Sequence, residues 1–332
     1  MEGLTLIDFG YLAAVPLLAT AQNTTLKALG YEKKARSDSQ LEKNADTLMS
    51  IITACASAGV ASVVICIFMF LSGNTSRVFE VSVDFWWAVA YKIPVYIVAV
   101  WSYAMAHRKG EMSLIGPLLA ITPAIIVVIA PATIHQTASP LGVLGVCLIV
   151  VGAYFLKFNQ RKGGLFSPLK ELWKDTGARF MMLTATLYAL SSVIDKVGLI
   201  AGGSDLKAAI LWTAVFNLVS SIIMFPLALI SLGKLRKSEY QKLPAVQEFI
   251  GSGGNKMFLT GLFNGTGGMF QMMAVNFIDV AYVNAIKRFS IVLSVMVGAF
   301  IFKEEDFRSR MLGASIMFAG VFALAVLVAL KK

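Results

Sequence analysis

The stretch LGVCLIVVGAYFL at residues 144–156 decides the fold, because a similar stretch, LGASIMFAGVFAL, returns at residues 312–324. The two segments align without gaps, and Gly145 and Gly152 of the first match Gly313 and Gly320 of the second. Seven residues make about two helical turns, so each glycine pair lies on one helix face and permits close approach of another helix. The match predicts an internal repeat. Chance similarity between two apolar helices is the alternative.

The rest of the chain is also strongly apolar. Of its 332 residues 57% are hydrophobic and only 14% are charged, and the mean hydropathy is +0.74. A membrane-spanning helix needs about 20 largely apolar residues, and such stretches recur here with short polar breaks. We therefore predict an all-α polytopic membrane protein with about ten transmembrane helices in the lipid bilayer. The predicted spans are 4–26, 48–71, 85–106, 112–131, 140–156, 179–200, 208–232, 256–277, 281–302 and 311–330.

The repeat divides the chain into two five-helix units. Residues 1–156 form the first predicted repeat, residues 157–178 a charged connecting loop, and residues 179–332 the second repeat. Because each unit has an odd number of spans, the second enters the membrane in the opposite orientation, which gives inverted repeats. Such an arrangement suits alternating access, in which two half-bundles rock about a site near the midplane.

The net charge of +10 has a topological explanation. Most of the lysines and arginines lie in the loops after the first, third, fifth, seventh and ninth spans, such as Lys27, Lys33 and Lys34 in the first loop. The positive-inside rule places these loops in the cytoplasm and both termini outside. No nucleic-acid-binding module is present, so a nucleic-acid partner is not expected.

Catalysis and cofactor binding have little support in the sequence. The two histidines, His107 and His135, are far apart and lack a nucleophile motif, and no phosphate-binding loop occurs. The three cysteines, Cys55, Cys66 and Cys147, lie within predicted spans and show no metal-binding spacing. We expect neither an enzyme nor a bound cofactor or metal.

Two further segments carry a family resemblance. These are SLIGPLLAITP at residues 113–123 and AYVNAIKRFS at residues 281–290, the second followed by Lys303-Glu304 before the last span. With the paired glycine helices, the chain resembles the drug/metabolite transporter superfamily of the EamA type, whose members pair two five-helix repeats. The first half departs from the pattern, since residues 132–136 hold no acidic residue. The resemblance also implies cytoplasmic termini, against the charge count, so the orientation is left open.

Ionisable residues within spans are candidates for a substrate site, because a charge in the bilayer centre is costly. Lys92 lies inside the third span with Tyr96 one turn later, and Lys287 and Arg288 lie inside the ninth with Asn284 on the same side. One inward cation in each half indicates an anionic substrate, since arginine and lysine bind carboxylate or phosphate. The alternative for each cation is a structural role, such as bonding to carbonyl groups or lipid headgroups.

Polar residues of other spans complete the predicted cavity. Tyr188 belongs to a stripe in the sixth span with Thr184, Ser191 and Asp195. For Asp195 we favour a local ion pair with its neighbour Lys196. The eighth span adds Asn264 and Gln271, with glycines between them that either weaken the helix beside a cavity or serve tight packing. Pro117 and Pro123 either kink the fourth span or are tolerated there.

The sequence thus predicts a secondary transporter of a small metabolite, for which the inward cations indicate an anion, in the bacterial inner membrane, as a monomer or homodimer. The alternatives are an exporter of amphiphilic drugs or amino acids, a lipid-linked sugar flippase, and a membrane scaffold or receptor that does not transport. The predicted substrate-binding residues are Lys92, Tyr96, Tyr188, Asn264, Gln271, Asn284, Lys287 and Arg288.

Overall fold

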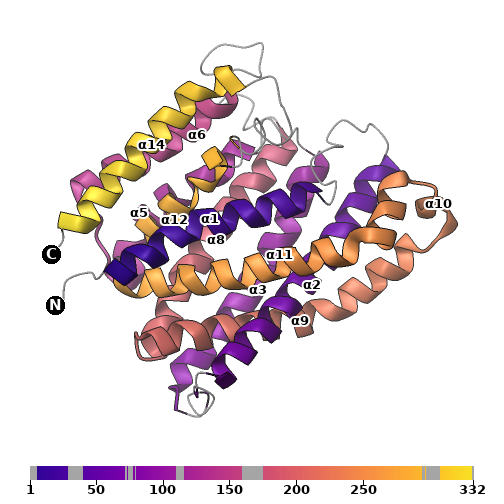
Figure 1. Cartoon of the computed structure of the whole chain (residues 1–332), viewed down its shortest axis with the longest axis horizontal. Helices are drawn as coiled ribbons and strands as arrows, with labels where there is room; N and C mark the ends of the chain where they lie inside the picture. Colours follow the sequence, from indigo (N-terminus) through magenta and orange to yellow (C-terminus); the bar gives the residue numbers. More distant parts are fainter. Residues whose placement is uncertain are drawn as a thin grey trace.

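A computed structural model describes residues 6–28, 40–71, 73, 78, 80–109, 116–158, 175–293, 296 and 307–330, and these residues are helical with short connections (Figure 1). The predicted connecting loop and the Lys303-Glu304 pair lie largely or wholly outside them. The helices are α1 (Leu6–Ala28), α2 (Gln40–Leu71), α3 (Val83–Lys109), η2 (Gly116–Ile121), α5 (Thr122–Ile134), α6 (Pro140–Phe158), α8 (Thr176–Ala201), α9 (Leu206–Leu235), α10 (Ser238–Gln241), α11 (Pro244–Phe277), α12 (Val280–Lys287) and α14 (Phe307–Leu330).

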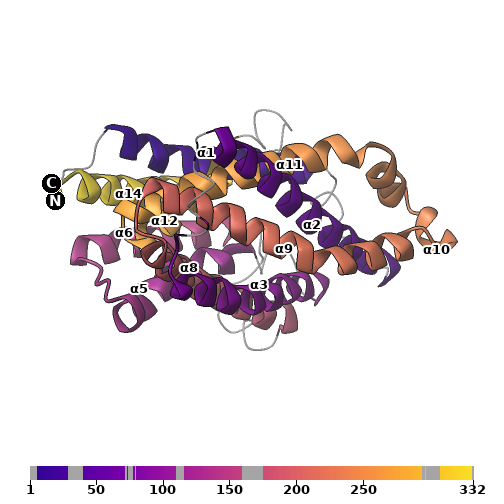
Figure 2. The same ribbon diagram turned by 90° about the horizontal axis from the view of Figure 1, so that it is seen from below.

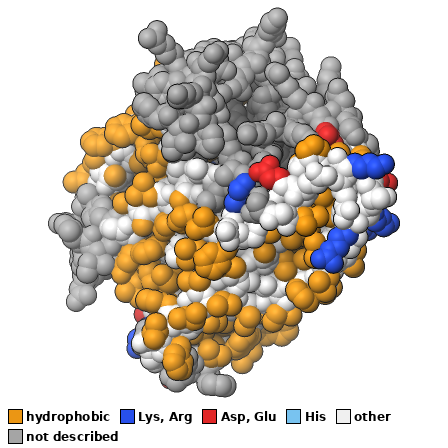
Figure 3. Space-filling view, turned by 45° about the vertical axis from the view of Figure 1, so that its right-hand side comes forward, with side chains coloured by type: hydrophobic (Ala, Val, Ile, Leu, Met, Phe, Trp, Pro, Cys, Tyr) orange, Lys and Arg blue, Asp and Glu red, His pale blue; other side chains and the backbone are white. Residues whose placement is uncertain are grey.

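Several helices have the length and composition of membrane spans. Among the described residues, Asn44–Leu71, Val83–Ala106, Thr176–Ala201 and Leu206–Leu235 are long and apolar enough to cross a bilayer, and three shorter apolar helices accompany them. Hydrophobic side chains cover much of the visible described surface, while charged ones gather mainly toward one end (Figure 3). Phe70 and Val128, for example, are each 75% exposed. An apolar outer surface of this extent fits lipid, and the chain is an integral membrane protein.

Two helices are longer than the spans predicted within them. Helix α2 begins at Gln40 and α11 at Pro244, whereas the apolar patterns predicted starts at 48 and 256. At 1.5 Å per residue these helices are about 48 and 51 Å long, well beyond a hydrocarbon core of about 30 Å. The extensions are helical but too polar to read as membrane spans. They pack around a small cluster formed by Ala45, Met49, Leu235, Val246 and Phe249.

The helices associate mainly in pairs that are distant in sequence. Helix α6 packs along α14, α3 along α8, α2 along α9 and α1 along α11, and α11 also contacts α2. Figures 1 and 2 show α6 and α14 together at one end of the bundle, and Figure 2 shows α1 and α11 on the opposite side from α3. The start of α1 and the end of α14 lie at the same end of the molecule (Figure 1). Every one of these pairs joins a helix before residue 159 to one after residue 174.

The repeated glycines form the contact between α6 and α14. A Cβ on Gly152 would lie 2.8 Å from the carbonyl oxygen of Gly313, and a Cβ on Gly320 would lie 2.8 Å from that of Gly145. Real side chains do not approach backbone atoms so closely, so glycine is required for this separation of the two helices. The predicted close approach of these helix faces is confirmed.

The predicted fourth and ninth spans are interrupted. The described part of the fourth, from Gly116 on, is the 3-10 helix η2 followed directly by α5, with Pro123 in the first turn of α5. The ninth begins with the eight residues of α12, turns at Arg288 and Phe289, and is helical again from Ser290 to Leu293. Proline lacks a backbone N–H and fixes its φ, which explains a new helix start at Thr122. At the second of these places the backbone stays hydrogen-bonded, since the N–H groups of Arg288 and Phe289 donate to the carbonyl oxygens of Ala285 and Ile286.

The glycines between Asn264 and Gln271 lie at helix contacts. Helix α11 runs unbroken through this region. A Cβ on Gly265 would lie 2.7 Å from Cβ of Ala61 on α2, and one on Gly267 would lie 3.3 Å from Cβ of Leu18 on α1. Of the two readings of these glycines, the structure supports tight helix packing.

Candidate functional site

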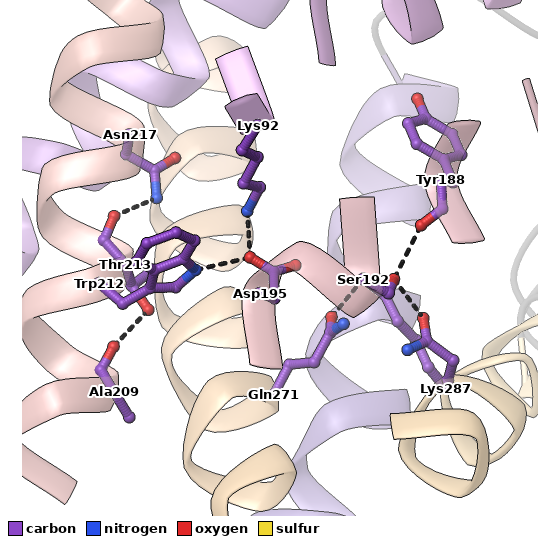
Figure 4. Close-up of polar contacts among 11 residues, drawn as sticks. Lys92, Tyr188, Ser192, Asp195, Ala209, Trp212, Thr213, Asn217, Gln271 and Lys287 are labelled. Atoms are coloured by element: carbon purple, nitrogen blue, oxygen red, sulfur yellow. Dashed lines mark hydrogen bonds and ion pairs between the residues drawn. The ribbon is translucent and has the colours of Figure 1, made fainter. Parts of the chain in front are cut away.

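A buried ion pair joins helices α3 and α8, which are far apart in the sequence. Lys92 of α3 and Asp195 of α8 are each 5% exposed, and Nζ of Lys92 donates to Oδ1 of Asp195 (Figure 4). The indole Nε1 of Trp212, on α9, donates to the same carboxylate oxygen at 2.6 Å. A buried charge is tolerated when it is paired and hydrogen-bonded, and here both conditions hold.

The predicted pair of Asp195 with Lys196 is wrong. Lys196 donates instead to the carbonyl oxygens of Val275 and Asn276 at 2.6 and 3.2 Å, at the C-terminal end of α11. Consecutive helical residues point about 100° apart, so Asp195 faces the bundle while Lys196 reaches a different neighbour. Two further members of the predicted stripe, Thr184 and Ser191, are also buried, and Tyr188 is partly buried.

Aromatic rings surround the Lys92 ammonium. Its Nζ lies 3.4 Å from the ring centroid of Phe216 and 5.4 Å from that of Trp212, both on α9. Tyr96, one turn along α3, packs edge-on against Phe216 with centroids 5.1 Å apart. A cation over an aromatic face is stabilised by the ring quadrupole, more so where water is excluded.

A glycine makes room for the indole. A Cβ on Gly198 would lie 2.1 Å from Cζ3 of Trp212. Gly198 lies on α8 nearly one turn after Asp195. The indole ring lies against α8 at this residue, where any side chain larger than that of glycine would overlap it. The 1% exposure of Trp212 shows how completely this position encloses the ring.

The other two predicted cations have neutral partners. Nζ of Lys287 donates to Oε1 of Gln271 at 2.6 Å (Figure 4), and Nη2 of Arg288 donates to Oγ1 of Thr122 at 3.3 Å. The Nε atom of Arg288 is buried and has no hydrogen-bond partner in the described chain. Neither cation bonds to a carboxylate within the described residues. Positive charge thus accumulates at the break in the ninth span.

The remaining predicted residues fall into two groups. Asn284 is buried and accepts from Oγ of Ser192 at 3.4 Å, and Ser192 also donates to the backbone oxygen of Tyr188 at 2.9 Å. Asn264 lies elsewhere on α11 and accepts from Gln22 of α1 at 3.2 Å. The structure therefore brings Tyr188, Gln271, Asn284 and Lys287 to the surroundings of α8 and α12, while Asn264 belongs to the contact between α1 and α11.

Sequence reasoning missed three members of the site. Trp212 sits in a strongly apolar stretch with no polar pattern around it, and nothing local marks it as a partner of Asp195. Phe216, four residues later, has the right spacing to share a helix face with Trp212, which is a weak signal. Thr122 precedes Pro123, and that proline predicts a kink in the fourth span. Nothing in the sequence indicates that Thr122 accepts a hydrogen bond from Arg288. Among the described residues, no three His, Cys, Asp or Glu side chains are placed to hold a metal ion.

Comparison with known proteins yields a fold and no family. No family model matches the chain, and no curated protein sequence matches it. A crystal structure of another protein superimposes with a TM-score of 0.64 over 97% of this chain and 96% of that one, at 13% sequence identity. At this identity the likeness shows a shared fold alone.

Proposed function

We propose that the protein is a secondary transporter that carries a small organic anion by alternating access between two inverted five-helix halves. The observation that carries the proposal is the adjacent pair Lys287 and Arg288, whose bonds go to the neutral Gln271 and Thr122. Two neighbouring cations inside a helical bundle repel each other and lose hydration. An anion bound between them would offset both costs. Arginine adds planar, two-pronged recognition of carboxylate or phosphate, and lysine a point charge.

The position of these cations supports a substrate site. Arg288 lies at the break of the ninth span, and its partner Thr122 lies at the break of the fourth. Interrupted helices that meet inside a membrane protein are where transporters hold substrates and ions, because side chains and backbone groups are released from helix packing there. Gln271, Asn284 and Tyr188 would line this site.

Helix pairing supports the inverted repeat. If the halves are equivalent, α1 corresponds to α8, α2 to α9, α3 to α11 and α6 to α14. Exchanging the halves then turns the α3–α8 pair into α11–α1, and it leaves α2–α9 and α6–α14 unchanged; all four pairs are present. The glycine contacts follow the same rule, because Gly145 faces Gly320 and Gly152 faces Gly313. A two-fold relation of this kind provides two equivalent ways to open the bundle.

The role of Lys92 in this proposal differs from that of the other cations. Asp195 already neutralises it in this conformation. We therefore assign first contact with the anion to Lys287 and Arg288. We also propose a bacterial inner membrane as its location. The distribution of lysines and arginines among the loops favours an orientation with the basic loops in the cytoplasm.

Ligand-induced thermal stabilisation of the purified protein tests this function, because a ligand that binds only the folded state raises its apparent stability. Anionic metabolites are expected to raise the midpoint temperature, and neutral and cationic ones of similar size are not. The double variant Lys287→Gln, Arg288→Gln should lose the response. Lys234→Gln is the matched control, since Lys234 is an exposed cation in the last turn of α9.

Two results would contradict the anion carrier. One is a response to anions that the double variant keeps in full. The other is stabilisation by amphiphilic amines or neutral amino acids alone, which would favour an exporter of such compounds.

A further inference from the structure

The surroundings of the Lys92 ammonium have the make-up of a binding site for an amine. One carboxylate oxygen of Asp195 accepts from Nζ, and the Phe216 and Trp212 rings lie 3.4 and 5.4 Å from it. A carboxylate beside aromatic faces is the arrangement by which proteins recognise alkylammonium groups. Asp195, Trp212 and Phe216 are called the ammonium cage below.

All three members of the cage come from the same half of the protein. Asp195 is on α8, and Trp212 and Phe216 are on α9. The 2.6 Å bond from Trp212 to Asp195 and the close fit of the indole over Gly198 tie Trp212 to α8 within the second half. From the first half, α3 contributes Lys92 and two rings that pack edge-on against the cage: Phe85 against Trp212, with centroids 5.3 Å apart, and Tyr96 against Phe216, with centroids 5.1 Å apart. The hydrogen-bonded carboxylate and indole thus belong to one half, and the ammonium beside them is a ligand tethered to the other.

We propose that the ammonium cage is a binding site for a primary alkylammonium group, which Lys92 occupies in this conformation and leaves when α3 separates from α8. Once Lys92 withdraws, Asp195 is a buried carboxylate without a counterion, and such a group strongly favours binding a cation. The departure of Lys92 rests on the proposed alternating access. The chemistry of the cage does not, and it is independent of the anion site at Lys287 and Arg288.

Chemical rescue tests the cage itself. Lys92→Ala removes the part of the side chain that corresponds to n-propylammonium. Adding n-propylammonium chloride to purified Lys92→Ala protein is expected to raise its midpoint temperature by about 2 to 4 °C once the site is mostly filled. Propan-1-ol and propionate should not do so. The same amine should raise the wild-type midpoint by much less, because Lys92 competes with it for the cage. It should leave the midpoint of Lys92→Ala, Asp195→Asn unchanged, because the carboxylate is gone.

Two outcomes would overturn the cage. One is equal stabilisation by propan-1-ol, which would mean simple filling of a void, and the other is no response to the amine by well-folded Lys92→Ala protein. If Lys92→Ala cannot be purified alone, the yield of monodisperse protein with and without propylammonium during purification replaces the midpoint. An unchanged yield would then count against the proposal.

Hydrogen exchange tests the withdrawal of Lys92 separately. In wild-type protein, propylammonium that captures a vacated cage should increase deuterium uptake in α3 around Lys92, and Asp195→Asn should abolish the increase. Rescue of Lys92→Ala together with unchanged uptake in wild-type protein would refute the withdrawal, and with it the link to alternating access. The same result would leave the anion site of the proposed function standing.

Discussion

The contact between α6 and α14 makes a quantitative prediction for Gly152→Ala. The added Cβ would lie 2.6 Å from the backbone nitrogen of Met317 and 2.8 Å from the carbonyl oxygen of Gly313. Non-bonded atoms settle at about 3.5 to 4.0 Å, so the helices would have to move apart locally by about 1 Å. Both obstacles are backbone atoms, and no rotamer change relieves them.

The expected cost follows from two opposing effects. Overpacking of a tight contact costs about 1 to 3 kcal/mol, and alanine in place of glycine within a helix returns up to about 1 kcal/mol. Gly152→Ala is therefore expected to lower the free energy of unfolding by up to about 2 kcal/mol, whereas the same change at an open helical glycine raises it by up to about 1 kcal/mol. Gly145→Ala should cost less, because its Cβ would meet mainly the flexible side chain of Leu324, at 2.8 Å.

Gly254→Ala is the matched control. Gly254 is exposed within α11, and a Cβ there would meet no atom within 4 Å. The same chemical change should be neutral or stabilising at this position. The assay is the fraction of protein that stays monodisperse after heating, measured for all three variants in the same detergent. The midpoints are expected to rise in the order Gly152→Ala, Gly145→Ala, Gly254→Ala.

Equal midpoints for Gly152→Ala and Gly254→Ala would refute the reasoning. That result would mean that α6 and α14 do not touch along their glycines in the membrane protein, and the packing argument for the repeat would fail. A lowered midpoint for Gly254→Ala alone would contradict the assignment of that position to an open helix face.

Three further predictions concern the interior and the topology. Asp195→Asn keeps an acceptor for Trp212 but leaves Lys92 without a counterion, and Lys92→Met leaves Asp195 without one. Each variant should therefore destabilise the protein by about 3 to 5 kcal/mol, and the double variant by less than their sum. Additive midpoint shifts in a double-mutant cycle would refute the ion pair. Gly198→Ala should displace the Trp212 ring and lower the melting midpoint by more than Gly254→Ala, and a matching midpoint would show that the ring does not pack there. In a cysteine-free background, Ser238→Cys, at the exposed start of α10, should react with an impermeant thiol reagent only after the cytoplasmic side is opened; labelling of intact cells would place this end outside.

Local physics explains what could be read from the sequence. The number of consecutive apolar residues needed to cross a bilayer is fixed by its thickness, so the membrane helices were recognisable from composition. The glycine face of α6 was also recognisable, because residues seven apart lie on one side of any helix. The starts of the helices α2 and α11 could not be read in this way, because hydropathy reports lipid contact and not where a helix begins.

The amino-acid pattern alone identifies a helical membrane protein, predicts that Gly145, Gly152 and Gly320 lie on contact faces, and singles out Lys92, Lys287 and Arg288 as cations inside predicted spans. Which of these cations is neutralised depends on how the helices pack. Helical period fixes the direction of a side chain on its own helix, but the group opposite depends on which helices pack together. Asp195 is 103 residues from Lys92, and no local pattern couples the two. The pairing of α3 with α8 therefore decides that the uncompensated charge lies at Lys287 and Arg288.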